Sequence, residues 1–390
     1  GESEIRNPLV SNDTMAAAEA VTAFGAAVKR ETGTWIVAGC GGNPARARGD
    51  IDVGNSGTAL RLLMGTCALL PAGSTITMTG DEQIQRRPAG PLLRSLRDLG
   101  AHAVSVNDND CPPVVIGGHL KGGQTLLEAR TSQFLSSLLL ACPLAENSTT
   151  IEVSLLNEPM YVDMTLKWLA DQNLQWETEG KRRFHLPGRQ QYSPFCKIIP
   201  GDFSTASFML GAGALKNNSI TCRGLDMNDP QPDRMMVEYL RNMGAHVSHD
   251  GDAVTVTGSG LQGREIDMNG TPDALPVMAV LGCFAEGRTA LLNVPQARVK
   301  ETDRIAVMTR ELRKMGAEIE ELDDGMIVSQ SSLRGTHVEG HGDHRVVMAL
   351  ALAGLASKGQ TTVSTAEAAA VTFPSFAECM QSLGAKLRQT

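Results

Sequence analysis

The phrase "GNSGTALRLLMGTCALLPAGSTITM" (Gly54–Met78) joins a polar cluster, an apolar helix, a turn of small residues and a strand. Four later stretches repeat this order: Arg130–Val153, Gly201–Cys222, Thr271–Val294 and Gly342–Thr365. Their helices are apolar nearly all round, as expected for helices enclosed within a domain. Internal repetition of this kind predicts a fold built from similar α/β units.

A second phrase alternates with the first. It is a helix that ends in Gly-Ala and is followed by a short strand. The copies have their glycines at Gly25, Gly100, Gly244, Gly316 and Gly384. Such a glycine marks the point where a helix C-terminus enters the left-handed conformation. Neighbouring copies lie about 70 residues apart, except for one double interval. We therefore expect a degenerate copy near Asn173, in "LADQNLQWE", where Gly-Ala is missing.

Six such units would group into two similar domains of three units each. Pro194 and Pro200 interrupt the pattern in "YSPFCKIIPGDFS", which predicts a boundary there. The expected domains are therefore residues 1–200 and 201–390, each a β/α domain with buried helices. The N-termini of these helices are expected to converge on the cleft between the domains.

The first unit is expected to be incomplete. The opening "GESEIRNPLV" matches the turn and strand that end the first phrase, as in "EGRTALLNV". On this alignment, the sixth buried helix and the polar cluster that would open it are missing.

Composition excludes several classes of function. The formal net charge is −8 and only 4% of residues are aromatic, which argues against nucleic-acid binding. No apolar run is long enough for a membrane span, and no signal peptide is recognisable, so a cytoplasmic protein is expected. None of the eight cysteines forms a CxxC pair, which predicts buried or inert thiols. His341 and His344 flank Asp343 at a spacing that could hold a metal, but no further ligands cluster there, so no metal is expected.

The polar clusters that open the buried helices leave two interpretations. Helix N-termini carry unpaired N–H groups and a positive dipole end, which favour anions. The clusters contain Asn55, Ser56, Thr131, Ser132, Ser204 and Asp273. Each of these residues could be only an N-cap, or the clusters could together bind an anionic ligand.

The stretch "RVKETDRI" (Arg298–Ile305) carries three cations and two anions. The apolar spacing from Ile305 onwards predicts a helix, with Thr302 and Asp303 as its opening residues. Arg304 would then lie in the first turn, where a cation opposes the helix dipole. A carboxylate or an anionic ligand should compensate it, and Asp303 alone could do so.

Arginine recurs at three comparable places. Arg86 and Arg87 precede a helix in "QRRPAG", Arg345 opens a buried helix in "GDHR", and Arg61 follows Gly57 in "GTALR". The fixed donor fork of arginine suits phosphate and carboxylate oxygens. The pattern predicts a small substrate with several anionic groups.

These motifs also carry a resemblance to a known family. The motifs are "GNSGTALR", "QRRPAG", "TSQFLSSLLLACPLA", "YVDMTLKWL", "PDALPVMAV", "RVKETDRI", "GDHR" and "TFPSF". In this order they resemble the 5-enolpyruvylshikimate-3-phosphate synthase family over nearly the whole chain. The resemblance implies two domains of three related units with the site in the cleft. It implies transfer of the carboxyvinyl group of phosphoenolpyruvate to the 5-hydroxyl of shikimate 3-phosphate, with release of phosphate and no metal or organic cofactor.

The resemblance also implies roles for individual residues. Asp273 would act near the 5-hydroxyl as general base or orienting group, and Glu301 would handle the proton of the methylene carbon, with Lys300 and His344 in the same catalytic group. The residues implied to hold phosphoenolpyruvate are Gly57, Arg87, Arg304, His344 and Arg345. Those implied to hold shikimate 3-phosphate are Thr131, Ser132, Gln133, Tyr161, Asp273, Gln296 and Lys300. A monomer is expected.

The chain departs from the family pattern at four places. The usual "PGSKS" opening is absent, Gln296 replaces a common asparagine, and Val371 replaces a common lysine before "TFP". Glu158 stands near a usual serine, where a carboxylate beside a phosphate site is unfavourable unless it points away. Two alternatives therefore stay open: a shortened homologue that binds anions but turns over poorly, and the related transferase acting on UDP-N-acetylglucosamine. That related family uses a cysteine on a mobile loop, and no cysteine here has that setting.

Overall fold

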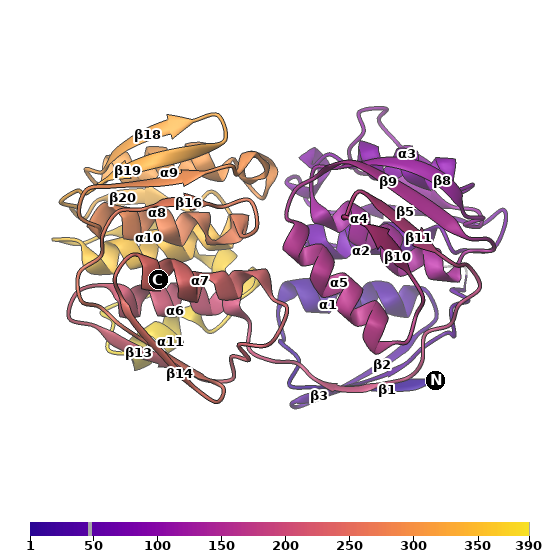
Figure 1. The fold of residues 1–390 in the computed structure, drawn as a ribbon, viewed down its shortest axis with the longest axis horizontal. Coiled ribbons are helices and arrows are strands. Elements are labelled where there is room, and N and C mark those ends of the chain that lie inside the picture. Colours follow the sequence, from indigo (N-terminus) through magenta and orange to yellow (C-terminus); the bar gives the residue numbers. More distant parts are fainter. Residues whose placement is uncertain (46–48, 390) are drawn as a thin grey trace. The chain divides into compact units, whose positions relative to one another are not determined.

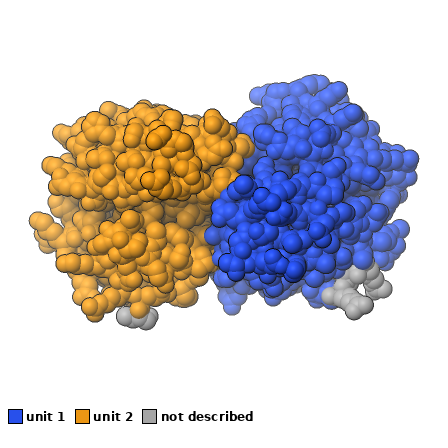
Figure 2. Space-filling model, turned by 90° about the horizontal axis from the view of Figure 1, so that it is seen from below, with its two compact units in different colours: residues 1–199 blue, residues 200–390 orange. Residues whose placement is uncertain are grey.

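The structure is a computed structural model that describes residues 1–45 and 49–389. The chain divides into two compact units, Gly1–Ile199 and Pro200–Thr390, which are coloured separately in Figure 2. Each unit has its own hydrophobic core of buried residues. The units are therefore described one at a time.

Unit 1 contains three four-stranded sheets and five α-helices among its described residues (Figure 1). Its helices are α1 (Asn12–Ala23), α2 (Gly57–Cys67), α3 (Gly90–Asp98), α4 (Ser132–Ala141) and α5 (Pro159–Asp171). The first sheet has the order β12 (Cys196–Ile198), β1 (Glu2–Arg6), β3 (Thr34–Ala38) and β2 (Ala27–Glu31). The second has the order β4 (Ile51–Asp52), β5 (Thr75–Thr79), β7 (Val114–Gly117) and β6 (His102–Ser105). The third has the order β10 (Glu177–Glu179), β11 (Arg183–Leu186), β9 (Thr149–Leu156) and β8 (Gly123–Ala129).

Unit 2 contains a three-stranded, a four-stranded and a two-stranded sheet in its described residues. Its helices are α6 (Phe203–Ala214), α7 (Met235–Asn242), α8 (Leu275–Phe284), α9 (Arg304–Lys314), α10 (His344–Ala356) and α11 (Phe376–Ser382). The three-stranded sheet has the order β13 (Ser219–Cys222), β15 (Ala253–Thr257) and β14 (His246–Asp250). The four-stranded sheet has the order β16 (Glu265–Asp267), β17 (Arg288–Leu292), β19 (Gly325–Ser329) and β18 (Glu318–Leu322). The two-stranded sheet pairs β20 (His337–Glu339) with β21 (Thr362–Ser364).

The same strand arrangement recurs in both units. The strands β4 and β5 lie parallel with α2 between them in sequence, and β7 then pairs antiparallel with β5. The pair β8 and β9 around α4 and the pair β16 and β17 around α8 repeat this arrangement. A parallel pair requires a crossover connection, and here the crossover is the buried helix. The structure thus confirms the repeated α/β units that the sequence predicts.

The helices of the first phrase form the interior of each unit. Nearly every residue of α8 is fully buried, and α6 and α10 are buried to a similar extent. In unit 1 the corresponding helices are α2 and α4. Small residues let these helices approach closely: a Cβ on Gly65 would lie 2.5 Å from the Ser137 carbonyl oxygen, and one on Gly211 would lie 2.9 Å from Val277. Such distances exclude any larger side chain without displacement of the neighbouring helix.

The Gly-Ala positions take the left-handed conformation as predicted. Gly100 has φ 93° and Gly316 has φ 97°. In the degenerate copy Asn173 has φ 57°, so asparagine replaces glycine there, as it can at a helix C-terminus. The last copy differs from the prediction, because residues 385–389 after Gly384 form no strand. No strand of the described residues pairs with them.

The first strand of the chain is β1, as the opening sequence predicts. Among the described residues, unit 1 has two buried helices of the first-phrase type, and unit 2 has three. Beside α2 and α4, unit 1 contains a cavity of about 580 Å³ lined by apolar side chains that include Leu62, Leu140, Met164 and Trp168. The described residues of unit 1 therefore leave part of the apolar surface of these helices uncovered.

Two findings concern the whole described chain. No helix in the described residues is long and apolar enough to cross a membrane. All eight cysteines are free thiols, and Cys67, Cys142 and Cys283 are buried as predicted. Burial raises the pKa of the Cys142 and Cys283 thiols to about 12, so these thiols are not reactive thiolates at neutral pH.

Candidate active site

In unit 1 the polar clusters lie at the N-termini of α2 and α4. Ser56 caps α2, and its hydroxyl accepts a hydrogen bond from the Ala59 N–H. Thr131 caps α4 through the Gln133 N–H. The capping interpretation therefore holds for Ser56 and Thr131. Asn55 does not cap the helix, because its amide group donates to Asp81 and its Oδ1 accepts no hydrogen bond within the described residues.

One hydrogen-bonded chain joins the two helix starts. Arg61 on α2 donates from Nη1 to Gln133 Oε1 at 2.8 Å, and Gln133 Nε2 donates to Thr58 Oγ1 at 2.9 Å. Arg61 is 7% exposed, and its guanidinium lies 6.0 Å from the centroid of the Phe134 ring. Gln133 is thus held by residues of the neighbouring repeat, which fixes the position of its amide.

Arg87 lies against the first residue of α2. It is 5% exposed, and a Cβ on Gly57 would overlap its Nη1 atom. Only a glycine at position 57 lets the guanidinium come this close to the helix backbone. The neighbouring Arg86 instead lies on the surface and pairs with Glu82. Of the two arginines in "QRRPAG", Arg87 is therefore the one placed at a helix N-terminus.

Gly57→Ala is expected to displace Arg87 and weaken the binding of an anion held by Arg87. The added methyl group cannot fit beside Nη1 unless the guanidinium moves away. The resemblance assigns Arg87 to phosphoenolpyruvate, so we expect KM for phosphoenolpyruvate to rise about tenfold, with a smaller change in KM for shikimate 3-phosphate. Steady-state kinetics with each substrate varied in turn measures both values. Equal effects on both substrates would contradict a local role for Arg87.

Glu158 points toward the start of α4. Its Oε2 accepts hydrogen bonds from Ser132 Oγ at 2.8 Å, from the Ser132 N–H at 3.1 Å and from Thr131 Oγ1 at 3.1 Å. Glu158 is 2% exposed and directly precedes α5. The carboxylate therefore does not point away from the cluster, which is the arrangement expected from the sequence to be unfavourable beside a phosphate site. Tyr161 lies in the first turn of α5, where its N–H donates to the Glu158 carbonyl.

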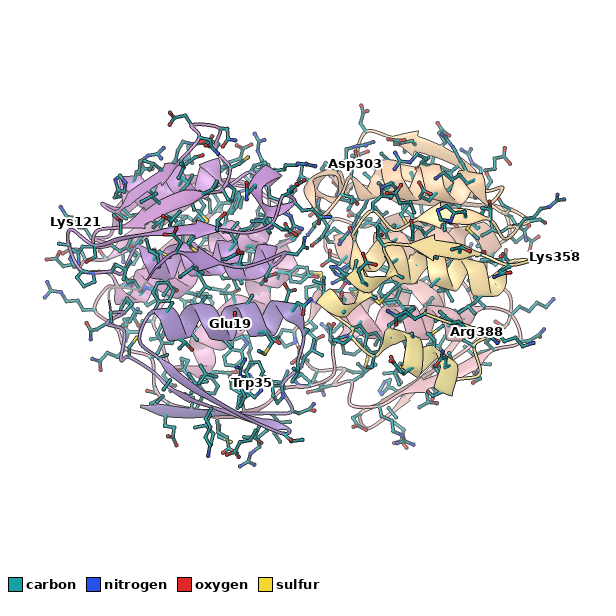
Figure 3. All side chains as sticks on the ribbon, turned by 180° about the vertical axis from the view of Figure 1, so that it is seen from behind. Glu19, Trp35, Lys121, Asp303, Lys358 and Arg388 are labelled. Carbon is teal, nitrogen blue, oxygen red and sulfur yellow. The ribbon has the colours of Figure 1, made fainter. Side chains whose placement is uncertain are left out.

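In unit 2 the charged loop and α9 begin as predicted. Asp303, labelled in Figure 3, is the N-cap of α9, and its Oδ1 accepts from the Ala306 N–H at 3.0 Å. The apolar face of α9 is buried. Asp303 also pairs with Arg298 through Oδ2 at 2.7 Å. Its side chain is not the compensating charge for Arg304, so the interpretation that Asp303 alone serves this purpose is wrong.

Arg304 is instead enclosed by three other carboxylates. Its Nε donates to Asp343 at 2.8 Å, its Nη1 to Asp273 at 2.7 Å and its Nη2 to Glu301 at 2.6 Å. The side chain is 1% exposed. Burial would lower the pKa of the guanidinium, but the three carboxylates outweigh it and raise this pKa well above its usual value. Arg304 therefore stays charged and holds the three acids together.

Asp273 faces three cations. Besides Arg304, it lies 3.3 Å from Arg345 Nη2 and 3.7 Å from Lys300 Nζ. Burial would raise the pKa of Asp273, but the three cations, Arg345 first among them, hold this pKa below its usual range. Asp273 is therefore ionised at neutral pH. The N-cap interpretation is wrong for this residue, because α8 has no side-chain cap and the carboxylate points at the cations.

The starts of α6 and α10 complete the group. Asp202, rather than Ser204, caps α6, and its carboxylate accepts from the Ser204 and Thr205 N–H groups. Ser204 Oγ instead accepts from Arg345 Nη1 at 2.6 Å. Asp343 caps α10 while binding Arg304, so one fully buried carboxylate serves both α9 and α10.

His344 and Gln296 carry buried polar atoms. His344 is 4% exposed, and neither of its ring nitrogens has a hydrogen-bond partner within the described chain. Burial and the nearby Arg345 lower the pKa of His344 to about 4, so the imidazole is neutral at pH 7. Gln296 donates from Nε2 to the Asn269 carbonyl at 2.9 Å, and its Oε1 has no partner among the described residues. Such atoms are available to a ligand.

A further buried acid, Glu311 on α9, binds the loop that precedes Asp343. Its carboxylate is fully buried and accepts from the Glu339 N–H at 3.0 Å, from His341 Nε2 at 3.1 Å and from Lys314 Nζ at 2.6 Å. Burial would raise the pKa of Glu311, but these donors outweigh it and lower this pKa to about 2. His341 is thus part of a hydrogen-bonded cluster, and no group of three potential metal ligands occurs in the described residues.

Glu311→Gln is expected to destabilise the protein by about 1–3 kcal/mol at pH 7, because charged donors lose an ionised acceptor. The pKa of Glu311 is depressed in the folded state, so its contribution is fully present above about pH 4.5 and is lost as pH falls toward 2. The difference in melting temperature between the two forms should therefore shrink on acidification. Thermal melts from pH 7 to pH 3 measure it, and a difference that stays constant with pH would contradict this role.

The predicted site residues fall into two sets, one in each unit. In unit 1 these are Gly57, Arg87, Thr131, Ser132, Gln133 and Tyr161, at the starts of α2, α4 and α5. In unit 2 they are Asp273, Gln296, Lys300, Glu301, Arg304, His344 and Arg345, around the starts of α8, α9 and α10. The predicted set lacks Arg61 and Asp343, although each stands in a quoted motif at a buried helix. Val371, the position of the common lysine, is the last residue of η6 (Ala366–Val371).

Comparison with known proteins identifies the family. The chain matches the family model of EPSP synthase (3-phosphoshikimate 1-carboxyvinyltransferase) over residues 1–380. It is 49% identical over 387 residues to the 3-phosphoshikimate 1-carboxyvinyltransferase of Acetivibrio thermocellus, a match that covers 99% of this chain and 91% of that protein. The protein of the same name from Ruminiclostridium cellulolyticum is 47% identical, with the same coverage.

Solved structures support the same assignment. The 2.37 Å structure of EPSP synthase from Acinetobacter baumannii has a TM-score of 0.81 and 27% identity, and covers 98% of this chain and 90% of that chain. A further structure from the same organism has a TM-score of 0.80. The similar sequences, the repeated units and the charged helix starts all point to one family. The chain belongs to the EPSP synthase family.

Proposed function

We propose that the protein transfers the carboxyvinyl group of phosphoenolpyruvate to the 5-hydroxyl of shikimate 3-phosphate and releases phosphate. The observation that carries this proposal, together with family membership, is the group of three acids around Arg304. It brings the carboxylates of Asp273, Glu301 and Asp343 together around Arg304, with Arg345 and the neutral imidazole of His344 beside them. Such a cluster suits proton transfer next to an anionic ligand.

Asp273 takes the proton of the 5-hydroxyl in this proposal. In the ligand-free protein its pKa is held low by three cations, so it is a weak base as it stands. Phosphoenolpyruvate carries a carboxylate and a phosphate that would engage Arg304 and Arg345. When these cations turn to the substrate, the pKa of Asp273 rises toward a value suited to accepting a proton. Substrate binding therefore activates the base.

Glu301 handles the proton on carbon. In the addition step the 5-oxygen bonds to C2 of phosphoenolpyruvate while a proton joins the methylene carbon to give a methyl group. In the elimination step that methyl group loses a proton as the C2–O bond to phosphate breaks. Glu301 hydrogen-bonds Arg304 at 2.6 Å, which places its carboxyl next to the cation proposed to hold phosphoenolpyruvate. Lys300 and His344 supply further donors for the charge that develops.

The remaining residues bind the two substrates. Arg87 beside Gly57 contributes to phosphoenolpyruvate binding, as proposed for Arg304, His344 and Arg345. The residues proposed to hold shikimate 3-phosphate are Thr131, Ser132, Gln133, Tyr161, Gln296 and Lys300. Thr131 and Ser132 stand at the start of α4, where hydroxyl and backbone donors suit a phosphate group. The unpartnered Gln296 Oε1 suits a hydroxyl of the acceptor. The eight free thiols support a cytoplasmic location.

Phosphate release tests this function. The purified chain is mixed with phosphoenolpyruvate and shikimate 3-phosphate, free phosphate is measured, and the enolpyruvyl product is identified by mass spectrometry. Matched reactions contain shikimate without its phosphate, or UDP-N-acetylglucosamine, as the acceptor. We expect phosphate and product with shikimate 3-phosphate. Release with UDP-N-acetylglucosamine alone would instead assign the other transferase activity.

A further inference from the structure

We propose that Glu158 limits the affinity of this protein for the phosphate group of shikimate 3-phosphate, because its carboxylate occupies the donors at the start of α4. The inference rests on the proposed function, which assigns Thr131 and Ser132 to that substrate. It adds a determinant of substrate affinity that the proposed roles do not include.

The contacts of Glu158 are those that a bound anion would make. One carboxylate oxygen accepts from a backbone N–H and from two hydroxyls, all at the first turn of α4. With 2% exposure, the residue is nearly removed from solvent. A phosphate oxygen at a helix N-terminus uses the same kinds of donor. The carboxylate therefore stands where the substrate phosphate is proposed to bind.

The backbone at Glu158 aims the side chain at α4. Glu158 has φ 58° and ψ 46°, a left-handed conformation that is unfavourable for a residue with a side chain. Although it directly precedes α5, its side chain makes no capping hydrogen bond to that helix. α5 begins with Pro159, and in its first turn the Tyr161 N–H donates to the backbone carbonyl of Glu158. The carboxylate thus serves α4 from the start of the neighbouring helix.

The carboxylate and a phosphate cannot share these donors. The Ser132 N–H and the two hydroxyls each have one hydrogen to donate. Two anions close together also repel each other where little water screens them. Shikimate 3-phosphate therefore binds through these donors only after the Glu158 carboxylate leaves them. The affinity for shikimate 3-phosphate is therefore reduced in proportion to the fraction of molecules in which the carboxylate has left these donors.

Two substitutions test the inference. Glu158→Ser removes the carboxylate and provides a hydroxyl, and Glu158→Gln removes the charge but keeps an oxygen that can cap α4. The matched controls are Glu152→Ser and Glu152→Gln on β9, which remove the same charge from an exposed position. Isothermal titration calorimetry on the full chain measures Kd for shikimate 3-phosphate, and thermal melts establish that each variant is folded.

We expect Kd for shikimate 3-phosphate to fall about tenfold or more in Glu158→Ser, and less in Glu158→Gln, with no change in the controls. Kd for phosphoenolpyruvate should stay within about twofold of the unsubstituted chain in every form. Unchanged or weaker binding in both Glu158 variants, with normal turnover, would overturn the inference and leave the proposed function standing. Absence of both binding and turnover in every form would overturn the proposed function, and the inference with it.

Discussion

Asp273→Asn is expected to reduce kcat by about 100- to 10,000-fold, because an amide cannot accept the proton of the 5-hydroxyl. The side chain keeps its shape but only one oxygen, so one of Arg304 and Arg345 retains an acceptor, now uncharged, and the other faces an NH2 donor. The protein should therefore still fold, with a loss of stability of about 1–3 kcal/mol. Phosphate release and circular dichroism melts measure the two effects separately.

A matched substitution distinguishes chemistry from charge. Asp250→Asn on β14 removes the same charge from an exposed strand of the same unit. This control should leave kcat and the melting temperature nearly unchanged. An Asp273→Asn protein with an unchanged kcat would remove Asp273 from the mechanism. A loss confined to KM would show that Asp273 orients the acceptor rather than deprotonating it.

The parts of the site that the sequence predicts are those set by neighbours in the chain. Asp303 caps α9 and Ser56 caps α2 because a cap acts within one helical turn. The repeats likewise predict the left-handed turn at Asn173, since each unit needs the same change of direction. Local rules and internal repetition thus account for the fold and for the helix starts.

The partners of each charge follow from tertiary packing instead. An arginine in the first turn of α9 predicts a compensating carboxylate, yet the nearest acid in sequence, Asp303, pairs with Arg298. Asp343 lies 39 residues from Arg304 in the sequence. The two side chains pair because of the way α9 and α10 pack. Glu158 reaches α4 across 26 residues for the same reason. No periodic pattern carries such information.

Arg304→Ala is expected to destabilise the protein by about 3–5 kcal/mol, because removing one partner leaves buried charges without compensation. Asp343 is fully buried, and the side chains of Glu301 and Asp273 are 14% and 21% exposed. For a unit of this size the melting temperature should fall on the order of 10 °C. Turnover should be lost as well, since Arg304 is proposed to bind phosphoenolpyruvate.

The control and the pH dependence make this test specific. Arg288→Ala removes an arginine from a surface ion pair with Glu320, which should cost no more than about 1 kcal/mol. In the unsubstituted chain the cations lower the pKa of Asp273, so their stabilisation is present above about pH 3.8 and is lost below it. The Arg304→Ala variant lacks the stabilisation that Arg304 gives to the ionised Asp273. The difference in melting temperature between the variant and the unsubstituted chain should therefore shrink at low pH. A loss of stability below about 1 kcal/mol at pH 7 would contradict this role. It would mean that other groups compensate the charges of the three acids and that Arg304 is not the centre of the cluster.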